Sequence, residues 1–263
     1  MVGLAVGSIA SPAHSASEAP SPARRIVVIA HRGAHQMAPE NTLPAIRAAI
    51  DLGVDYVEVD VQQTKDSAFV LMHNSTVDAR TNGTGAVRDL TLAQIRALDA
   101  GIRFDSSFAG TRVPTFDEAL ALMRGKVAAY VDIKNAPPDS IAVILRRNEM
   151  LASVVYAHPA ALAAMRRVEP ALRPMPEYPG APEAVAALAD SLRPDVIAIS
   201  SLRRLTPEAV AACHAAGAKV FLDIMASDNP EGWNFALSCG VDGLQTDRPA
   251  ELIAFLRERG LHR

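Results

Sequence analysis

The sequence has few aromatic residues, two cysteines and no excess of positive charge. Aromatic side chains make up 5% of its 263 residues and the formal net charge is −3, so the chain lacks the stacking surfaces and the basic surface that nucleic-acid binding uses. We therefore expect no nucleic-acid partner. Cys213 and Cys239 fall in two segments with helical patterns, which leaves a disulfide and two buried free thiols both open.

Long apolar runs are also missing, so no stable membrane span is expected. Residues 1–24 nevertheless differ in composition from the rest. Residues 1–10 are small and apolar, and residues 11–23 are rich in Ala, Ser and Pro, as in an export signal followed by a linker, although no basic residue precedes the apolar run. This segment is predicted to be either an export signal, for a periplasmic or extracellular protein, or a disordered tail of a cytoplasmic one.

From about residue 25 to residue 263 strand-like and helical patterns alternate, which indicates one α/β domain. The expected strands are Ile26–Ala30, Tyr56–Val61, Val127–Ile133, Val154–Ala157, Leu172–Met175, Val196–Ile199, Val220–Ile224 and Gly243–Gln245. The expected helices are Leu43–Leu52, Thr115–Met123, Ala160–Val168, Pro182–Leu188, Pro207–Ala216, Gly232–Cys239 and Pro249–Arg259. Eight strands with intervening helices predict a (β/α)8 barrel, whose active site lies at the C-terminal ends of the strands.

One region, about residues 66–114, breaks the alternation between the second barrel strand and the helix that follows it. A turn at Lys65–Ser67, a short strand at Val70–His73, a tight turn at Asn82–Gly85 and a short helix at Leu92–Leu98 are expected here. We expect a lid-like insertion over the barrel mouth. It would bring His73 opposite His31, giving the acid and the base that a two-step phosphoryl transfer requires.

Charged residues lie at or just past the ends of several expected strands. Glu58 and Asp60 lie two residues apart, so they share one face of a strand whose valines face the core. Two adjacent carboxylates repel unless a cation lies between them, and Mg²⁺ or Ca²⁺ is the usual partner of oxygen ligands. Asp132 and Lys134 end the next barrel strand in the same way, adding a third carboxylate and a cation for a phosphate oxygen. These residue types predict a metal-assisted phosphoester enzyme.

Each of these residues alone has an ordinary structural explanation. His31 could be a half-buried hydrogen-bonded residue, Glu58 or Asp132 a salt-bridge partner, and Arg32 or Lys134 a solvated cation. Their coincidence favours a site, because charged residues are disfavoured on inward strand faces unless function requires them.

The ordered series of motifs resembles the glycerophosphodiester phosphodiesterase family from about residue 26 to the C-terminus. The motifs are His31-Arg32-Gly33, Pro39-Glu40-Asn41-Thr42, Gly53–Val61, Thr64–Asp66, Val70–His73, Arg80–Gly85 and Gly240–Pro249. The resemblance implies a metal-dependent phosphoric diester hydrolase on a TIM barrel, which cleaves a small glycerophosphodiester to glycerol 3-phosphate and an alcohol. Members of the family are thought to use the glycerol hydroxyl of the substrate as nucleophile, forming a cyclic phosphate that water then opens.

The resemblance also implies roles for individual residues. His31 and His73 correspond to the acid/base pair, and their order does not say which is which. Arg32 and Lys134 correspond to the residues that bind the phosphate. The divalent metal, Mg²⁺ or Ca²⁺, would be held by Glu58, Asp60 and Asp132.

Four sites depart from the family pattern. Ser67 replaces the glycine usual after Lys65-Asp66. Asp132 stands where glutamate is usual, so either the metal lies closer to that strand or a water completes its shell. Asn74 replaces an aspartate after the second histidine and carries no charge. Asp223-Ile224-Met225 stands where many relatives have a tryptophan-containing segment that packs on the glycerol, which leaves the head group open. Asp223 and Glu177 are candidate contacts to the substrate, or simple salt-bridge partners at the barrel mouth.

Two other functions remain open on the sequence. One is a lyase-like relative that acts on a lysophospholipid or a sugar phosphodiester and releases a cyclic phosphate. The other is a non-catalytic binding protein on the same barrel, which the presence of His31, Arg32, Glu58, Asp60 and His73 disfavours. The oligomeric state is not predicted.

Overall fold

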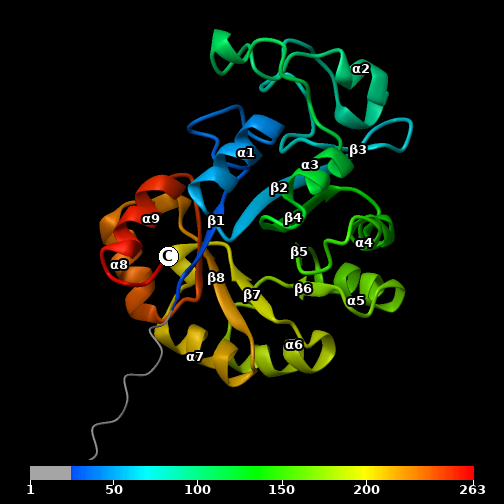
Figure 1. Cartoon of the computed structure of the whole chain (residues 1–263). Coiled ribbons are helices and arrows are strands. Elements are labelled where there is room, and N and C mark those ends of the chain that lie inside the picture. The colour runs from blue at the N-terminus through cyan, green and yellow to red at the C-terminus, as the bar shows by residue number, and fades with distance from the viewer. Residues whose placement is uncertain (1–24) are drawn as a thin grey trace, which may run out of the picture.

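The computed structural model describes residues 25–263 as a barrel of parallel strands with helices around it (Figure 1). The predicted export signal or disordered tail, residues 1–24, lies outside the described residues. The barrel strands are β1 (Val27–Ala30), β2 (Tyr56–Gln63), β4 (Ala128–Asn135), β5 (Val154–Tyr156), β6 (Arg173–Met175), β7 (Val196–Ile199), β8 (Lys219–Asp223) and β9 (Gly243–Thr246). All eight predicted strands are present, with ends that differ by up to two residues.

The strands follow the order β6-β5-β4-β2-β1-β9-β8-β7 around the barrel. Closure between β6 and β7 is slight. It consists of a single bridge, Glu177 with Ala198, supported by hydrogen bonds from the Tyr178 N–H to the Ala198 carbonyl (2.7 Å) and from the Ala198 N–H to the Pro176 carbonyl (2.9 Å). The barrel is therefore nearly closed, as the predicted (β/α)8 architecture requires.

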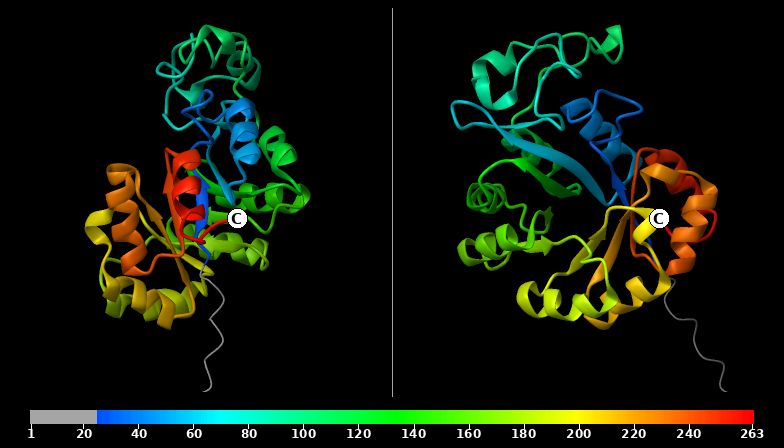
Figure 2. Two further views of the ribbon diagram at one scale, coloured as in Figure 1. Left: turned by 60° about the vertical axis from the view of Figure 1, so that its left-hand side comes forward. Right: turned by 180° about the vertical axis from the view of Figure 1, so that it is seen from behind.

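Helices surround the barrel in both views of Figure 2. They are α1 (Leu43–Leu52), α3 (Phe116–Met123), α4 (Pro138–Arg147), α5 (Pro159–Val168), α6 (Val185–Leu192), α7 (Pro207–Ala215), α8 (Pro230–Cys239) and α9 (Pro249–Arg257). Helix α4 was not predicted, although it buries Ile141, Ile144 and Leu145 with helical spacing. The helix predicted from Pro182 begins as a 3₁₀ turn, and α6 proper starts at Val185. Within residues 25–263, no helix is long and apolar enough to span a membrane.

The insertion forms a separate lobe above α1 and α3 in the view of Figure 1. Its strand β3 (Phe69–Leu71) pairs antiparallel with the end of β2, and α2 (Leu92–Arg96) follows. Both predicted elements are present but shorter than expected. The lobe has its own apolar core, which consists of Val70, Met72, Val77, Val87, Ile95, Ala100 and Val113.

The buried apolar residues around the barrel form two further clusters. The larger lies between the strands and the helices and includes both cysteines, Cys213 and Cys239, which are buried free thiols. The smaller fills the barrel interior and consists of Ile29, Tyr130, Val154, Met175, Val196, Ala198 and Phe221. Because three of these residues, Tyr130, Ala198 and Phe221, also line the cavity above, this cluster forms the floor of the candidate site.

Candidate active site

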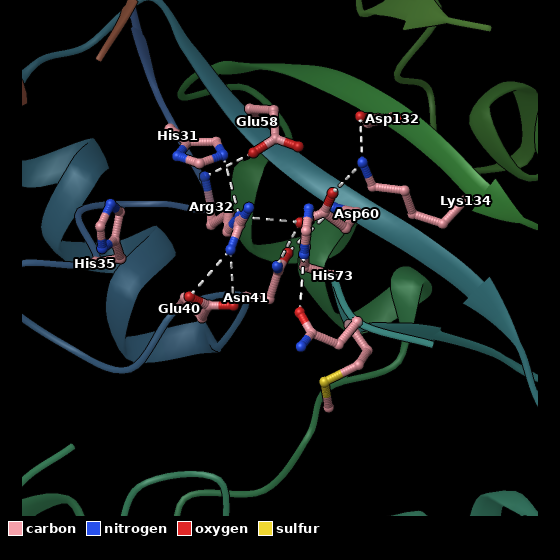
Figure 3. A network of polar contacts seen from close by, with 12 residues as sticks. His31, Arg32, His35, Glu40, Asn41, Glu58, Asp60, His73, Asp132 and Lys134 are labelled. Atoms are coloured by element: carbon pink, nitrogen blue, oxygen red, sulfur yellow. Dashed lines mark hydrogen bonds and ion pairs between the residues drawn. The ribbon is translucent and has the colours of Figure 1, made fainter. Parts of the chain in front are cut away.

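A cavity of about 270 Å³ lies at the C-terminal ends of the barrel strands. Eight of the nine predicted site residues line it: His31, Arg32, Glu58, Asp60, His73, Asp132, Lys134 and Asp223. Figure 3 shows how most of them converge from β1, β2, β4 and the insertion. A larger hollow, of about 720 Å³ between α6 and α7, contains none of the predicted residues.

A sharp turn after β1 places His31 and Arg32. Arg32 and Gly33 have φ of 54° and 80°, so two successive residues adopt the left-handed region and reverse the chain. A Cβ at Gly33 would lie 2.8 Å from the Ala45 backbone, which leaves room only for glycine against α1. The Arg32 N–H also donates to Glu58 Oε2 at 2.7 Å, which ties the turn to β2.

The neighbours of His31 indicate which ring nitrogen carries the proton. Its Nδ1 lies 2.6 Å from Asp247 Oδ1, and its Nε2 lies 3.1 Å from Arg32 Nε. Arginine can only donate, so Nε2 carries the lone pair, and Nδ1 therefore carries the proton that Asp247 accepts. His31 thus presents a proton acceptor at Nε2, at the edge of the cavity.

Asp247 has a second histidine partner that the sequence did not single out. His35 Nε2 lies 2.8 Å from the same oxygen, Oδ1, that accepts from His31. Burial raises the pKa of Asp247, but the hydrogen bonds from the two histidines lower it more, and the net pKa lies well below the usual value. Asp228 fixes the backbone here, because its Oδ2 accepts from the Asp247 N–H at 2.8 Å.

The Arg32 guanidinium is oriented by two carboxylates. Its Nη1 donates to Glu40 at 3.2 Å, and its Nε lies 3.5 Å from Asp60 Oδ2. Glu40 also pairs with Arg80 of the insertion at 3.1 Å, so it links the barrel turn to the lobe. These contacts hold the positive charge of Arg32 beside the carboxylates (Figure 3).

Glu58, Asp60 and Asp132 bring carboxylate oxygens within 4.8 Å of one another, which suits a divalent metal ion. Asp132 reaches this group although it is one methylene shorter than the family's usual glutamate. Asn41 donates to Asp60 Oδ2 at 2.7 Å and accepts from the Asp60 N–H at 3.1 Å, which fixes that carboxylate. Lys134 Nζ lies 3.2 Å from Asp60 and 2.7 Å from Asp132, so a cation already contacts two of the three.

Burial and mutual repulsion disfavour the charged form of these carboxylates. Burial raises the pKa of Glu58 well above its usual range, and the charges of Asp60 and Asp132 raise it further. Burial also raises the pKa of Asp132, although the Lys134 ammonium opposes this shift. A divalent cation among the three oxygens would relieve this repulsion, so the donor set fits the metal that the family implies.

His73 enters the site from the insertion. Gln62 on β2 donates to the carbonyls of Met72 (2.8 Å) and Asn74 (2.6 Å), which clamps the chain on either side of His73. The His73 Nδ1 lies 2.9 Å from Asn74 Oδ1, and because an amide oxygen only accepts, Nδ1 carries a proton and Nε2 is left for the substrate. His73 and His31 line the same cavity, as the sequence predicted.

The two predicted substrate contacts differ in position. Asp223, at the end of β8, lines the cavity, and burial raises its pKa. Glu177 does not line the cavity. It pairs with Arg204, accepts from Ser200 Oγ at 2.9 Å and from the Tyr156 hydroxyl at 3.3 Å, and so supports two residues that do line it.

Comparisons with known proteins agree with this geometry. Residues 31–251 match the glycerophosphoryl diester phosphodiesterase family. A glycerophosphodiester phosphodiesterase of Caldanaerobacter subterraneus subsp. tengcongensis is 34% identical over 252 residues, covering 90% of this chain and 100% of that protein. The crystal structure of a glycerophosphodiester phosphodiesterase from Agrobacterium tumefaciens has a TM-score of 0.77 at 28% identity and covers 86% of this chain and 97% of its own.

A phosphodiesterase from Oleispira antarctica, solved with the product sn-glycerol-3-phosphate, shares the fold, with a TM-score of 0.80 at 22% identity, covering 88% of this chain and 96% of its own. The family match extends over most of the described chain and includes every motif that builds the cavity. The chain therefore belongs to the glycerophosphoryl diester phosphodiesterase family and is a phosphoric diester hydrolase on a TIM barrel.

Proposed function

We propose that the cavity at the barrel mouth binds a glycerophosphodiester and releases glycerol 3-phosphate and an alcohol. The observation that carries this proposal is the convergence of two histidines, two phosphate-binding cations and three carboxylates on one cavity of about 270 Å³. Arg32 and Lys134 bind the non-bridging phosphate oxygens and stabilise the charge that grows on them. The choice of substrate is supported by the Oleispira antarctica phosphodiesterase, which has the same fold and was solved with the product sn-glycerol-3-phosphate.

Glu58, Asp60 and Asp132 hold the divalent metal, Mg²⁺ or Ca²⁺. When bound, the metal neutralises phosphate charge and polarises a phosphoryl oxygen. Asn41 keeps the Asp60 carboxylate in position for this role through two hydrogen bonds. Oxygen-only ligands favour a hard cation, and relative activity with Mg²⁺ and Ca²⁺ at matched concentrations decides between the two.

His31 is the base of the first step and His73 is its acid. When Arg32 turns from His31 to the phosphate, the Nε2 lone pair of His31 takes the proton from the attacking glycerol hydroxyl, and the Asp247 carboxylate stabilises the imidazolium that forms. His73 acts as the imidazolium: its Nδ1–H donates to Asn74 Oδ1, and its Nε2–H gives a proton to the leaving alkoxide. In the second step the roles reverse, and water opens the cyclic phosphate.

These two roles can be separated with a second substrate whose leaving group needs no proton. A p-nitrophenyl ester of glycerol phosphate releases a stable phenolate, so His73→Ala should lose much less activity on this ester than on glycerophosphocholine. His31→Ala should lose activity on both. Equal losses in both variants on both substrates would contradict the assignment.

Asp223 and the cavity wall bind the glycerol part. Asp223 and Ser200 offer polar groups to hydroxyls, while Tyr156 and Phe221 cover the carbon skeleton. Glu177 acts here by holding Ser200 and Tyr156. Asp223→Asn should raise KM for glycerophosphodiesters more than it lowers kcat, because the contact is made equally in the ground state and the transition state.

The full chain, incubated with glycerophosphocholine and glycerophosphoethanolamine, tests the overall proposal by ³¹P NMR. Glycerol 3-phosphate should appear with added Mg²⁺ or Ca²⁺, disappear with EDTA, and be lost in His31→Ala but not in His214→Ala, a surface histidine that pairs with Asp242. A cyclic phosphate that persists as the end product would instead identify a lyase. No phosphorus product with either metal would overturn the proposed substrates.

Export of the protein remains a proposal based on residues 1–24 alone. N-terminal sequencing of the protein recovered from its native host separates the two possibilities. A mature chain that begins near residue 24 in the periplasmic or extracellular fraction would support a cleaved signal. An intact N-terminus in the cytoplasm would overturn it.

A further inference from the structure

A second cluster of metal-ligating side chains lies beside the carboxylate site. His31, His35 and Asp247 bring two imidazole nitrogens and one carboxylate oxygen within 4.8 Å of one another. Both nitrogens approach the same oxygen, Asp247 Oδ1, at 2.6 and 2.8 Å. This cluster differs in chemistry from Glu58, Asp60 and Asp132, because two of its three donors are nitrogen.

The histidines are held in place by the backbone around them. The turn that carries both is fixed on α1, where the Ala34 N–H donates to the Ala45 carbonyl at 3.0 Å. The His35 N–H donates to the Gly33 carbonyl at 2.9 Å, and the two rings meet edge to face with centroids 5.7 Å apart. The donors therefore converge before any ion binds, which lowers the cost of ordering a site.

The distances are close to those of a tetrahedral zinc site. Zn–N and Zn–O bonds of about 2.0–2.2 Å place neighbouring ligands about 3.3–3.6 Å apart, so the present contacts need to open by roughly 0.5–1 Å. The side chains of Asp247 and His35 are 33% and 24% exposed, so an ion and a water molecule can reach them from solvent. Two imidazoles, one carboxylate and a water form a donor set that zinc enzymes use.

We propose that His31, His35 and Asp247 form a second metal site, specific for Zn²⁺, whose occupation inhibits the enzyme. Imidazole nitrogen is a good ligand for Zn²⁺ and a poor one for Mg²⁺ or Ca²⁺, so the carboxylate site and this site select different ions. Binding of Zn²⁺ goes beyond the proposed function, whereas its inhibitory effect rests on the proposed role of His31.

Inhibition follows from the proton balance on His31. In the metal-free state its proton lies on Nδ1 and its lone pair on Nε2. Coordination uses the Nδ1 lone pair, so the ring proton moves to Nε2 and no acceptor remains for the glycerol hydroxyl. The Nε2–H would then face the Arg32 Nε–H, and because two donors cannot share a hydrogen bond, Arg32 is displaced from its present contact. His35 would coordinate through Nε2, so its proton moves to Nδ1. Both imidazoles then stay neutral, and zinc binding releases no proton.

Binding is measured without reference to activity. Co²⁺ is titrated as a spectroscopic substitute for Zn²⁺ into the full chain, with the carboxylate site saturated by Mg²⁺. A tetrahedral site with two imidazoles should give an intense visible absorption that Zn²⁺ abolishes, whereas Co²⁺ bound to oxygens and water absorbs weakly. Absence of the intense band in the unsubstituted protein would overturn the site.

His35→Gln removes one zinc ligand and keeps a donor for Asp247. We expect the cobalt band to disappear and Zn²⁺ affinity by calorimetry to fall more than about 10-fold, since even substitutions outside the metal shell reach that size. His214→Gln is the matched control, because it removes another histidine paired with an aspartate, Asp242, and leaves the three ligands intact. An unchanged affinity in His35→Gln would contradict the proposal.

Hydrolysis rates then test the effect on function. With saturating Mg²⁺, low concentrations of Zn²⁺ should inhibit the unsubstituted protein and His214→Gln, each relative to its own rate without Zn²⁺, and His35→Gln should resist. Inhibition that excess Mg²⁺ relieves would place Zn²⁺ in the carboxylate site and overturn the proposed mechanism of inhibition. Tight Zn²⁺ binding without inhibition would retain the site and argue against His31 as the base, which separates the two proposals.

Discussion

His31 contacts one group that can only donate, Arg32 Nε beside Nε2, and one carboxylate that accepts, Asp247 beside Nδ1. Asp247→Asn should therefore disturb the reaction without disturbing the fold, because an amide can present its NH₂ to Nδ1 and favour the wrong tautomer. We expect kcat to fall by about 10²–10⁴-fold with little change in KM. Steady-state kinetics across pH checks this, since loss of the charged partner also changes the pH profile.

Asp190→Asn, a substitution on α6 beside the hollow at α7, is the control for a general loss of acidic charge. It should leave kcat unchanged. An Asp247→Asn variant with a normal kcat and pH profile would show that Asp247 does not orient His31.

Glu58 links the site to stability through its raised pKa. The folded protein holds the Glu58 proton to a higher pH than the unfolded chain, so the folded state binds more protons above the usual carboxyl range. The free energy of unfolding therefore falls as pH rises through the raised pKa. Without divalent metal at about pH 8, Glu58→Gln should stabilise the protein by about 1 kcal/mol or more, which is roughly 2–4 °C in Tm.

The gain should vanish near pH 3, below the usual carboxyl pKa, where Glu58 is protonated in both states, and should reverse with saturating Mg²⁺, because the variant loses a metal ligand. Thermal unfolding followed by circular dichroism measures all three conditions. Glu258→Gln, with a side chain that is 78% exposed, serves as the control and should be neutral. A lower Tm for metal-free Glu58→Gln at the higher pH would contradict the shift.

Site residues at or near the end of a predicted strand could be identified from the sequence, whereas residues that act through contacts between distant segments could not. Glu58, Asp60 and Asp132 were found because a period of two puts charges on a face that should be buried. Asp247 obeys the same rule at the end of β9 and could have been found. Asn41 could not, because its two hydrogen bonds to Asp60 join segments 19 residues apart through a turn with φ of 55°.

At the scale of elements, the insertion has a core of its own and carries His73. Ile95 is fully buried in that core, so Ile95→Ala should leave a cavity and destabilise the lobe by about 2–5 kcal/mol. Trypsin should then cut residues 78–110 faster, while the main unfolding transition of the barrel changes less. Activity should fall because His73 loses its support.

Ile102→Ala gives the matched comparison, because this side chain is 45% exposed and its removal leaves no cavity. Unchanged proteolysis in Ile95→Ala would show that the lobe is not an independent unit.

Helix α4 is a helix that the sequence pattern did not predict. Its start, Pro137-Pro138, reads as a break, yet proline fits the first turn of a helix, where the N–H has no partner. The apolar spacing of Ile141, Ile144 and Leu145 was present but covers only five residues of this ten-residue helix. Barrel strands were easier, because most are short apolar runs with a charged or polar residue at or just after the end.

For the whole molecule, the alternation of strands and helices predicted the barrel but not which two neighbouring strands pair least. β2 and β4 pair through seven residue pairs, whereas one bridge, from Glu177 just after β6 to Ala198 of β7, joins the other two strands. The number of partner residues between two strands depends on three-dimensional closure, which no local pattern encodes. This weakly paired junction between β6 and β7, the seam, lies beside the cavity, because Ala198, Ile199 and Ser200 line the cavity.

Hydrogen exchange should reveal this seam. Amides of Arg173–Met175 and Val196–Ile199 should exchange faster than those of Tyr56–Gln63, because opening β6 from β7 breaks fewer hydrogen bonds than opening β2 from β4. Glycerol 3-phosphate with Mg²⁺ should slow exchange in Val196–Ile199, since a ligand in the cavity contacts the end of β7 and binds the closed barrel more tightly. Exchange in α5, which lies outside the cavity, should not change with ligand. Equal exchange across the barrel, or a ligand effect as large in α5 as in β7, would mean that the site and the seam are not coupled.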